Sequence, residues 1–342
     1  MTGVQEIADE LVASGAERGV QVAAYVDGKQ VVDVVAGMAD PTTGRPVTPD
    51  TLFYNWSIGK GATATLVHRL GLDPETRVVE VWPEFGKHGK DVVTVRQVLD
   101  HTAGVPGLPA GVTVDDVCSW PTMVAALEDA QLWWEPGTQV GYHAYTFGYL
   151  CGEIVRRVTG RELGDVLADL TVDIGRPGEI RYGMSDPAGL AVLDDAPSDV
   201  DWSQMPPEML RAAPLAVMPT AALGADPRML AADIPAGAKV TARAMAALSA
   251  SWLASPRLAD VTTVSAEGED QVYGNDCRMS LGFALGLPFE EGAPRAFGWA
   301  GAGGSWAGAD PDRGVALALT KNELARDFTT VERLVGAVLA EV

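Results

Sequence analysis

Cysteine and histidine are scarce in this chain of 342 residues. Its three cysteines, Cys118, Cys151 and Cys277, are an odd number without a C-x-x-C spacing, so the sequence indicates neither a disulfide framework nor a thiolate metal site. The four histidines are scattered and lack the spacing of metal ligands. We therefore expect no metal and no cofactor, and we interpret the cysteines as small core residues.

Basic residues and long apolar runs are also rare. The chain has 25 lysines and arginines against 46 aspartates and glutamates, a formal net charge of −21, which argues against nucleic acid or an anionic membrane as a partner. No window of the sequence has the length of a membrane span, and the first 11 residues lack the basic region of a secretory signal. The sequence thus predicts a cytoplasmic protein with a small-molecule substrate and leaves its oligomeric state open.

Segments typical of strands lie at both ends of the chain, with helical segments between them. An Asp-Gly pair joins residues 20–26 to residues 30–37 and favours a hairpin. Residues 175–237, rich in Pro, Asp and Met, predict loops and short helices over a cleft. The other predicted strands are residues 281–287, 296–300, 305–309 and 315–320, and the other predicted helices are residues 93–105, 124–130, 149–159, 242–253 and 328–340.

This order predicts an α+β fold, in which an antiparallel sheet is flanked by the N- and C-terminal helices and joined to an all-helical lobe. We expect a discontinuous sheet domain of residues 1–60 and 250–342. Residues 61–249 would then form a mostly helical domain, with the active-site cleft between the two domains.

A serine and a lysine stand three positions apart in residues 54–68, YNWSIGKGATATLVH, which read as a turn running into a helix. Side chains at this spacing share a helix face, so Ser57 and Lys60 can point into one cleft. A serine hydroxyl needs a base to take its proton as it attacks, and a lysine serves if burial keeps part of it neutral. The N–H groups at a helix start also favour a developing oxyanion.

Two further segments could complete such a site. Tyr142 lies in the turn-rich residues 134–145, where a tyrosine could relay a proton to a leaving group. The glycine-rich residues 297–305 could let a ligand approach a strand edge and leave backbone N–H groups free. Taken singly, Tyr142 could equally be a packing residue, and the glycines could form a plain β-turn.

Together these motifs resemble the serine β-lactamase and penicillin-binding-protein-like family, in its class C β-lactamase-related branch with the family VIII carboxylesterases and transacylases. The resemblance runs over about residues 10–340. The motifs that carry it, in chain order, are Ser57-x-x-Lys60, residues 98–104 (VLDHTAG), Pro136-Gly137-Thr138 with Tyr142, and Gly301-x-Gly303-Gly304 with residues 309–311 (ADP).

The resemblance implies the two-lobe fold and acyl transfer through Ser57, with Lys60 and Tyr142 sharing the base and acid roles. It also implies an oxyanion hole made by the backbone N–H groups of Ser57 and Ala302. Substrate-binding roles are expected for Trp56, His143, Trp299 and Gly301, with His143 lining the cleft beside Tyr142.

Three departures separate the chain from typical β-lactamases. The family's Tyr-x-Asn is Tyr142-His143-Ala144 here, so the amide that would grip a substrate side chain is absent. The family's Lys-Thr-Gly is Trp299-Ala300-Gly301, which replaces a cation by an apolar wall and one N–H donor. The segment after the Ser57 helix is also short for the family. The first two changes resemble the esterase branch.

Other enzyme classes fit the sequence less well. An α/β-hydrolase needs G-x-S-x-G and a later histidine, and although residues 303–307 (GGSWA) come near that motif, no histidine follows His143. Gly301 to Gly304 lead into a strand, whereas a phosphate-binding loop leads into a helix.

The sequence therefore predicts a serine enzyme that forms an acyl-Ser57 intermediate, most simply a carboxylesterase acting on small esters, with thioesters and amides as further substrates. A biosynthetic transacylase and a catalytically inactive binding protein remain as alternatives. A dry mouth lined by tryptophans would favour the transacylase, because it would admit an organic acceptor in place of water. The candidates for that lining are Trp56, Trp133, Trp134, Trp299 and Trp306.

Overall fold

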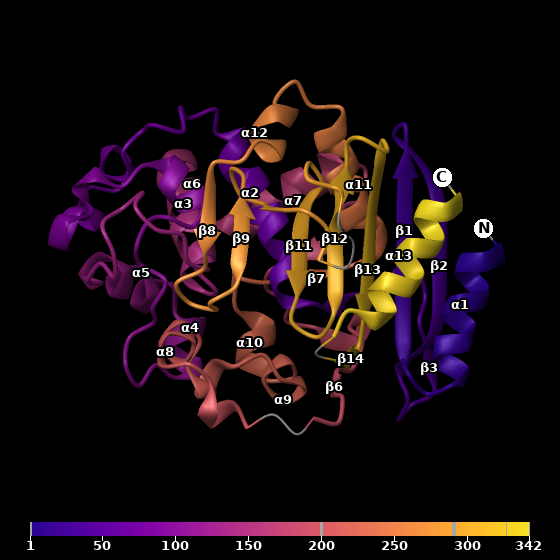
Figure 1. Cartoon of the computed structure of the whole chain (residues 1–342). Helices are drawn as coiled ribbons and strands as arrows, with labels where there is room; N and C mark the ends of the chain where they lie inside the picture. The colour runs from indigo at the N-terminus through magenta and orange to yellow at the C-terminus, as the bar shows by residue number, and fades with distance from the viewer. Residues whose placement is uncertain (1, 199–200, 289–291, 326, 342) are drawn as a thin grey trace.

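A strand near the start of the chain, residues 19–26, pairs with a strand near its end, residues 315–321, in the computed structural model. The structure describes residues 2–198, 201–288, 292–325 and 327–341. Within this described part, nine strands form one antiparallel sheet (Figure 1). Their order across the sheet is β3 (Arg45–Pro46), β2 (Lys29–Asp40), β1 (Gly19–Val26), β13 (Val315–Lys321), β12 (Ser305–Asp310), β11 (Phe297–Gly301), β10 (Ala284–Leu285), β9 (Asp276–Met279) and β8 (Ala266–Glu269).

Strand β1 lies inside the sheet, where Val22 faces Val34 of β2 on one side and Leu319 of β13 on the other. Because side chains alternate along a strand, the even-numbered valines of β1 point to one face and Ala23 and Tyr25 to the other. Both faces are covered, since β1 is buried along almost its whole length. The sequence of β1 is therefore almost entirely apolar. It lacks the alternation of polar and apolar residues that is typical of a strand with one exposed face.

Helices cover the sheet on its two faces. The terminal helices α1 (Thr2–Ala13) and α13 (Thr329–Glu341) share one apolar core with alternate residues of β1, β2 and β13, and both ends of the chain lie at this side of the molecule (Figure 1). Helix α11 (Ala242–Leu253) packs on β1, β12 and β13 and belongs to the second, larger core with Ala23, Ala316 and Ala318.

The middle of the chain is mostly helical. Its α-helices are α2 (Lys60–Arg69), α3 (Val95–Leu99), α4 (Val114–Cys118), α5 (Trp120–Asp129), α6 (Thr146–Thr159), α7 (Leu163–Asp173), α8 (Pro207–Ala212), α9 (Ala221–Gly224) and α10 (Pro227–Ala231), followed after α11 by α12 (Leu258–Thr262). The 3₁₀-helices are η1 (Trp56–Gly59), η2 (Val78–Glu80), η3 (Pro83–Val92), η4 (Pro187–Gly189), η5 (Trp202–Gln204) and η6 (Leu215–Val217).

Two small sheets connect this helical part to the rest of the chain. Strand β7 (Lys239–Val240) pairs with β4 (Phe53–Tyr54) and with β5 (Ile180–Arg181), and β6 (Asp194–Asp195) pairs in parallel with β14 (Glu323–Leu324). The β4–β7 pairing holds the segment just before Ser57 against residues 239–240. The division into domains at residues 60 and 250 stays a prediction.

The predicted α+β fold is confirmed, with its antiparallel sheet and terminal helices. The predicted helix over residues 93–105 is wrong in length, because α3 ends at Leu99 and His101 then adopts a left-handed φ of 63°. The predicted strand over 281–287 shrinks to β10, and the region 175–237 consists of short elements and loops as predicted, although residues 199 and 200 lie outside the described part. No helix among the described residues is long and apolar enough to cross a membrane.

Candidate active site

Ser57 lies in η1, at the junction between the sheet and the helical part. Two contacts fix this short helix to the end of β13: the Asn55 side chain donates to the Lys321 carbonyl at 2.8 Å and accepts from the Lys321 N–H at 3.2 Å. Trp56 has a left-handed φ of 51°, a conformation that is uncommon for a bulky residue and gathers at functional sites. Ser57 itself is partly exposed, whereas Trp56 and Ile58 beside it are buried.

Lys60 begins α2 and directs its amine at the serine. Its Nζ lies 3.0 Å from Ser57 Oγ and 2.9 Å from the carbonyl oxygen of Ala236, and the residue is fully buried. Burial lowers the pKa of the Lys60 ammonium to about 7, because an uncompensated charge is costly away from water. A large share of Lys60 is therefore neutral near neutral pH and able to accept a proton.

Tyr142 approaches the same oxygen from the opposite lobe. Its hydroxyl lies 2.8 Å from Ser57 Oγ, and Lys60 Nζ lies 5.0 Å from the centre of its ring. Burial, and to a smaller degree the neighbouring Tyr273, raise the pKa of Tyr142 far above its ordinary range. The phenol is therefore protonated near neutral pH, and it can donate a proton to an oxygen that replaces or adjoins Ser57 Oγ.

Asp270 holds the backbone of Tyr142, a role the sequence gave no signal for. Its buried carboxylate accepts the N–H of Tyr142 at 2.9 Å and the N–H groups of Val272 and Tyr273 at 2.8 and 2.9 Å. The Tyr273 ring then packs edge-on against Tyr142, with 5.6 Å between centroids. The turn between β8 and β9 thereby fixes the position of Tyr142.

Gly301 brings the end of β11 against η1. A Cβ at this position would lie 2.2 Å from the Asn55 carbonyl oxygen and 2.2 Å from Ser305 Oγ, distances no side chain could occupy. The next residue, Ala302, is thus held beside the Ser57 segment. The oxyanion hole expected from the backbone N–H groups of Ser57 and Ala302 stays a prediction.

The structure does not bring His143 into the cleft. Its side chain is completely buried, with Nδ1 bonded to the Gly141 carbonyl at 2.6 Å and Nε2 accepting the N–H of Val105 at 3.1 Å. Burial lowers the pKa of His143 to about 4, so the ring is neutral. The expectation that it lines the cleft is wrong: a residue next to Tyr142 points to the opposite side of the extended backbone.

Trp299 and Trp56 also differ from expectation. The Trp299 indole N–H donates to the Gly282 carbonyl at 2.8 Å, so it is no free donor for a substrate. The Trp56 ring is buried and stacks on Tyr54 with 4.2 Å between centroids. Trp134 and Trp306 are buried as well, and Trp133 and Trp134 line a cavity whose lining residues do not include Ser57, Lys60 or Tyr142. The idea of a tryptophan-lined mouth is therefore wrong.

His101 contributes a neutral ring behind Tyr142 in addition to ending a turn. It stacks on Phe147 at 4.7 Å between centroids and contacts the rings of Tyr142 at 5.4 Å and Trp299 at 5.3 Å. Burial, with His143 and Lys60 nearby, lowers the pKa of His101 well below its ordinary value.

The rival nucleophile Ser305 is fully buried in β12. No group of three or more His, Cys, Asp or Glu side chains in the described part is arranged to hold a metal ion.

Several known proteins are similar to this chain. The family model described as Beta-lactamase matches residues 4–340. The chain is 33% identical to the esterase/beta-lactamase LipL of Mycobacterium tuberculosis, over 90% of this chain and 77% of the relative. Two solved structures, a family VIII carboxylesterase (TM-score 0.90) and a penicillin-binding protein homologue from Caulobacter crescentus (TM-score 0.89), are each 30% identical over 100% of this chain and 97% of theirs.

Proposed function

The chain belongs to the beta-lactamase family and is a serine hydrolase, and on this premise we propose that it is a carboxylesterase of small esters with Ser57 as its nucleophile. The observation that carries the proposal is the position of Ser57 Oγ, within 3.0 Å of Lys60 Nζ and 2.8 Å of the Tyr142 hydroxyl. Its substrates are small molecules with an ester or amide bond, as the relatives named esterase and carboxylesterase support.

In the proposed first half-reaction, neutral Lys60 takes the proton of Ser57 as Oγ bonds to the carbonyl carbon of the ester. The carbonyl oxygen becomes an oxyanion, which the backbone N–H groups of Ser57 and Ala302 would stabilise. The bond to the leaving alcohol breaks as Tyr142 donates its proton to that alcohol oxygen. The products are the alcohol and an ester of Ser57.

In the second half-reaction, water attacks the acyl group on Ser57. The phenolate of Tyr142 takes the proton of this water, and the ammonium of Lys60 returns its proton to Ser57 as the acid leaves. Each residue ends in its starting protonation state. A proton donor and a proton acceptor with separated pKa values therefore serve both halves.

The residues around Ser57 favour an ester over a β-lactam. A β-lactam carries a carboxylate that a lysine of the Lys-Thr-Gly motif could pair with, and this chain has Trp299 there, buried and already bonded to Gly282. Ala144 also stands where the family's asparagine amide would contact a substrate side chain. Without these polar anchors, binding depends on the acyl and alcohol groups themselves.

Intact-mass spectrometry after treatment with a fluorophosphonate, together with p-nitrophenyl butyrate turnover, tests the proposal. We expect one adduct and steady release of nitrophenol with the wild type, and neither with Ser57→Ala. Ser305→Ala is the matched control, because it removes a buried hydroxyl without a partner among the described residues and should keep full activity. An adduct or turnover in Ser57→Ala would refute the nucleophile. An acyl-enzyme that persists in water but is discharged by added alcohols would replace the esterase by a transacylase.

A further inference from the structure

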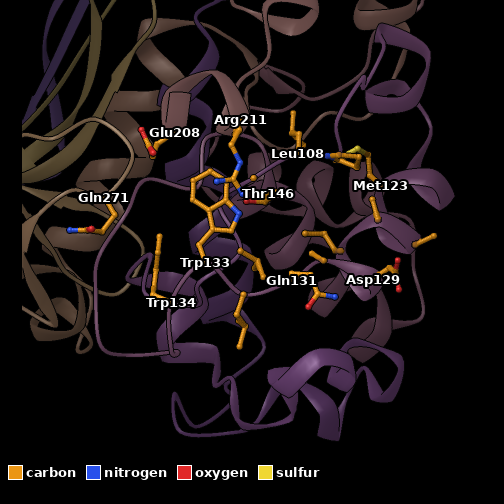
Figure 2. Close-up of a pocket in the computed structure, with 18 of the residues that line it drawn as sticks. Leu108, Met123, Asp129, Gln131, Trp133, Trp134, Thr146, Glu208, Arg211 and Gln271 are labelled. Atoms are coloured by element: carbon orange, nitrogen blue, oxygen red, sulfur yellow. The ribbon is translucent and has the colours of Figure 1, made fainter. Parts of the chain in front are cut away.

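A cavity of about 920 Å³ lies in the mostly helical part of the molecule (Figure 2). Residues 105–109, helix α5 with the loop that follows it, the start of α6, helix α8 and Gln271 form its wall. Its volume falls within the range of about 300–1,000 Å³ that small-molecule sites occupy. Ser57, Lys60 and Tyr142 are not among its lining residues, so the ester-cleaving site leaves this space unexplained.

The wall of the cavity combines apolar and polar side chains and includes a fixed aromatic ring. Trp133 is seated against Gly107, where an added Cβ would lie 2.5 Å from the ring. The guanidinium of Arg211 lies 3.9 Å from the centre of the same ring, and the Leu108 N–H donates to the Arg211 backbone carbonyl at 2.9 Å. These contacts hold the indole in one orientation, so the ring needs no further ordering to contact a ligand.

One buried polar group in this wall lacks a partner. Thr146, the first residue of α6, lines the cavity (Figure 2) and is 1% exposed. Its hydroxyl makes no hydrogen bond within the described part of the chain. A buried hydroxyl without a partner costs free energy, and that cost is recovered when a ligand supplies the missing hydrogen bond.

A second threonine in the same wall provides a contrast. The hydroxyl of Thr122 donates to Ser119 Oγ at 2.7 Å, so it already has its partner. The Thr146 hydroxyl is thus available to bond to a ligand, whereas the Thr122 hydroxyl is already bonded.

We propose that this cavity is a second ligand-binding site, which takes a flat, uncharged aromatic molecule carrying one hydroxyl or carbonyl group. The aromatic ring packs on the wall formed with Trp133, and the polar substituent bonds to the Thr146 hydroxyl. An uncharged ligand fits better than an anion, since Arg211 is the one cation in the wall and Glu208 and Asp129 lie there too. The site does not depend on the chemistry proposed for Ser57.

Isothermal titration of the full-length protein with 2-naphthol and with naphthalene tests the proposal. We expect the wild type to bind 2-naphthol about tenfold more tightly than naphthalene, because naphthalene leaves the Thr146 hydroxyl unpaired. Thr146→Val should abolish this preference, Thr146→Ser should restore it, and Thr122→Val should leave it unchanged. A preference that survives in Thr146→Val, or no binding of 2-naphthol by the wild type, would refute the site.

A fluorescence measurement locates the bound molecule. We expect 2-naphthol to quench part of the tryptophan emission of the wild type and to lose most of that quenching in Trp133→Phe, which keeps an aromatic wall and therefore keeps binding by calorimetry. Equal quenching in both proteins would place the ligand elsewhere. The same titration in Ser57→Ala should give unchanged affinity, which separates this site from the ester-cleaving one.

Discussion

Burial shifts the pKa values of Lys60 and Tyr142, the two side chains that contact Ser57, in opposite directions. Lys60 loses its charge easily because it is enclosed, and its pKa is lowered to about 7, whereas enclosure raises the pKa of Tyr142 and keeps its proton on. The same physical cause thus makes one group a base and the other an acid. A lysine in water, with a pKa of about 10.4, would keep its proton at neutral pH and could not serve as the base.

The first prediction concerns the pH dependence of turnover. Only neutral Lys60 can take the Ser57 proton, so kcat/KM for p-nitrophenyl butyrate should rise with pH, by about tenfold per unit well below the pKa of about 7, and level off above it. Initial rates between pH 5.5 and 9, corrected with Ser57→Ala as the blank, give the profile. Lys60→Arg, which stays protonated, should show no rising limb. A flat wild-type profile would rule out Lys60 as the base.

The second prediction uses the leaving group to isolate Tyr142. Removing the proton donor in Tyr142→Phe should lower kcat for an alkyl ester such as methyl butyrate by about 10²–10³-fold. The loss should be smaller for p-nitrophenyl butyrate, because nitrophenolate leaves without being protonated. Steady-state rates on both esters give the ratio. Equal losses on the two substrates would mean that Tyr142 acts on Ser57 or on water and leaves the departing alcohol alone.

For single residues of the site, the sequence allowed a prediction where the chemistry permits only a few residue types. Ser57, Lys60 and Tyr142 could be grouped because few residues can serve as nucleophile, base and acid. The directions of His143 and of the Trp299 N–H could not be predicted, since each depends on a backbone group far along the chain, the Val105 N–H and the Gly282 carbonyl. Asp270 gave no signal, because a single aspartate in a polar turn is ordinary.

Among the elements, the contact between the end of β11 and η1 decides the geometry of the site. Gly301 lies where these two elements meet, and the Asn55 carbonyl occupies the place of a side chain. Asn55 in turn is bonded to Lys321 of β13. The turn that carries Ala302 and the helix that carries Ser57 are therefore positioned by the same backbone.

The third prediction is that Gly301→Ala separates these elements. The added methyl would force the end of β11 away from η1, misplacing the Ala302 N–H and lowering kcat by about 10²-fold or more, as expected when an oxyanion donor is lost. Turnover of p-nitrophenyl butyrate and thermal unfolding are the measurements.

Gly336→Ala in α13 is the control for this change. Nothing lies within 4 Å of the Cβ it would add, and alanine is the better helix former, so activity should be unchanged and stability slightly higher. Normal kcat in Gly301→Ala would show that the contact does not position the site.

Long apolar elements were predictable and short polar ones were not. β1, β2, β12, β13 and α11 carry patterns that burial on a sheet or helix face requires. Strands β8 and β9, Ala-Glu-Gly-Glu and Asp-Cys-Arg-Met, lie at the edge of the sheet, where no apolar pattern marks them. The helix expected over 93–105 was too long because His101 takes a conformation that sequence patterns assign to glycine.

On the scale of the whole molecule, a buried ion pair joins segments from both ends of the chain. Lys321 of β13 contacts Glu17, which follows α1, and each side chain is 1% exposed. Thr330 of α13 donates to the same Glu17 oxygen at 2.5 Å. Burial raises the pKa of Glu17, an effect that Lys321 opposes, so each charge depends on the other.

The fourth prediction is a double-mutant cycle on this pair. Lys321→Met leaves the Glu17 carboxylate buried and uncompensated, which should cost about 3–5 kcal/mol of unfolding free energy, and Glu17→Met should cost a similar amount. The double variant should recover most of the loss, because two apolar side chains can pack together. Urea unfolding at pH 7 measures each corner. Additive losses would mean that the two residues act independently.

The pairing of β1 with β13 also has a consequence for synthesis. A ribosome releases Ser57, Lys60 and Tyr142 long before Lys321, whose backbone anchors Asn55 and whose strand completes the sheet beside β1. Until then the β1–β2 hairpin has one edge without its final neighbour, and the Ser57 helix lacks its anchor. The nascent chain therefore carries Ser57 through most of translation without the contacts that position it, and the proposed site can form only after β13 has emerged.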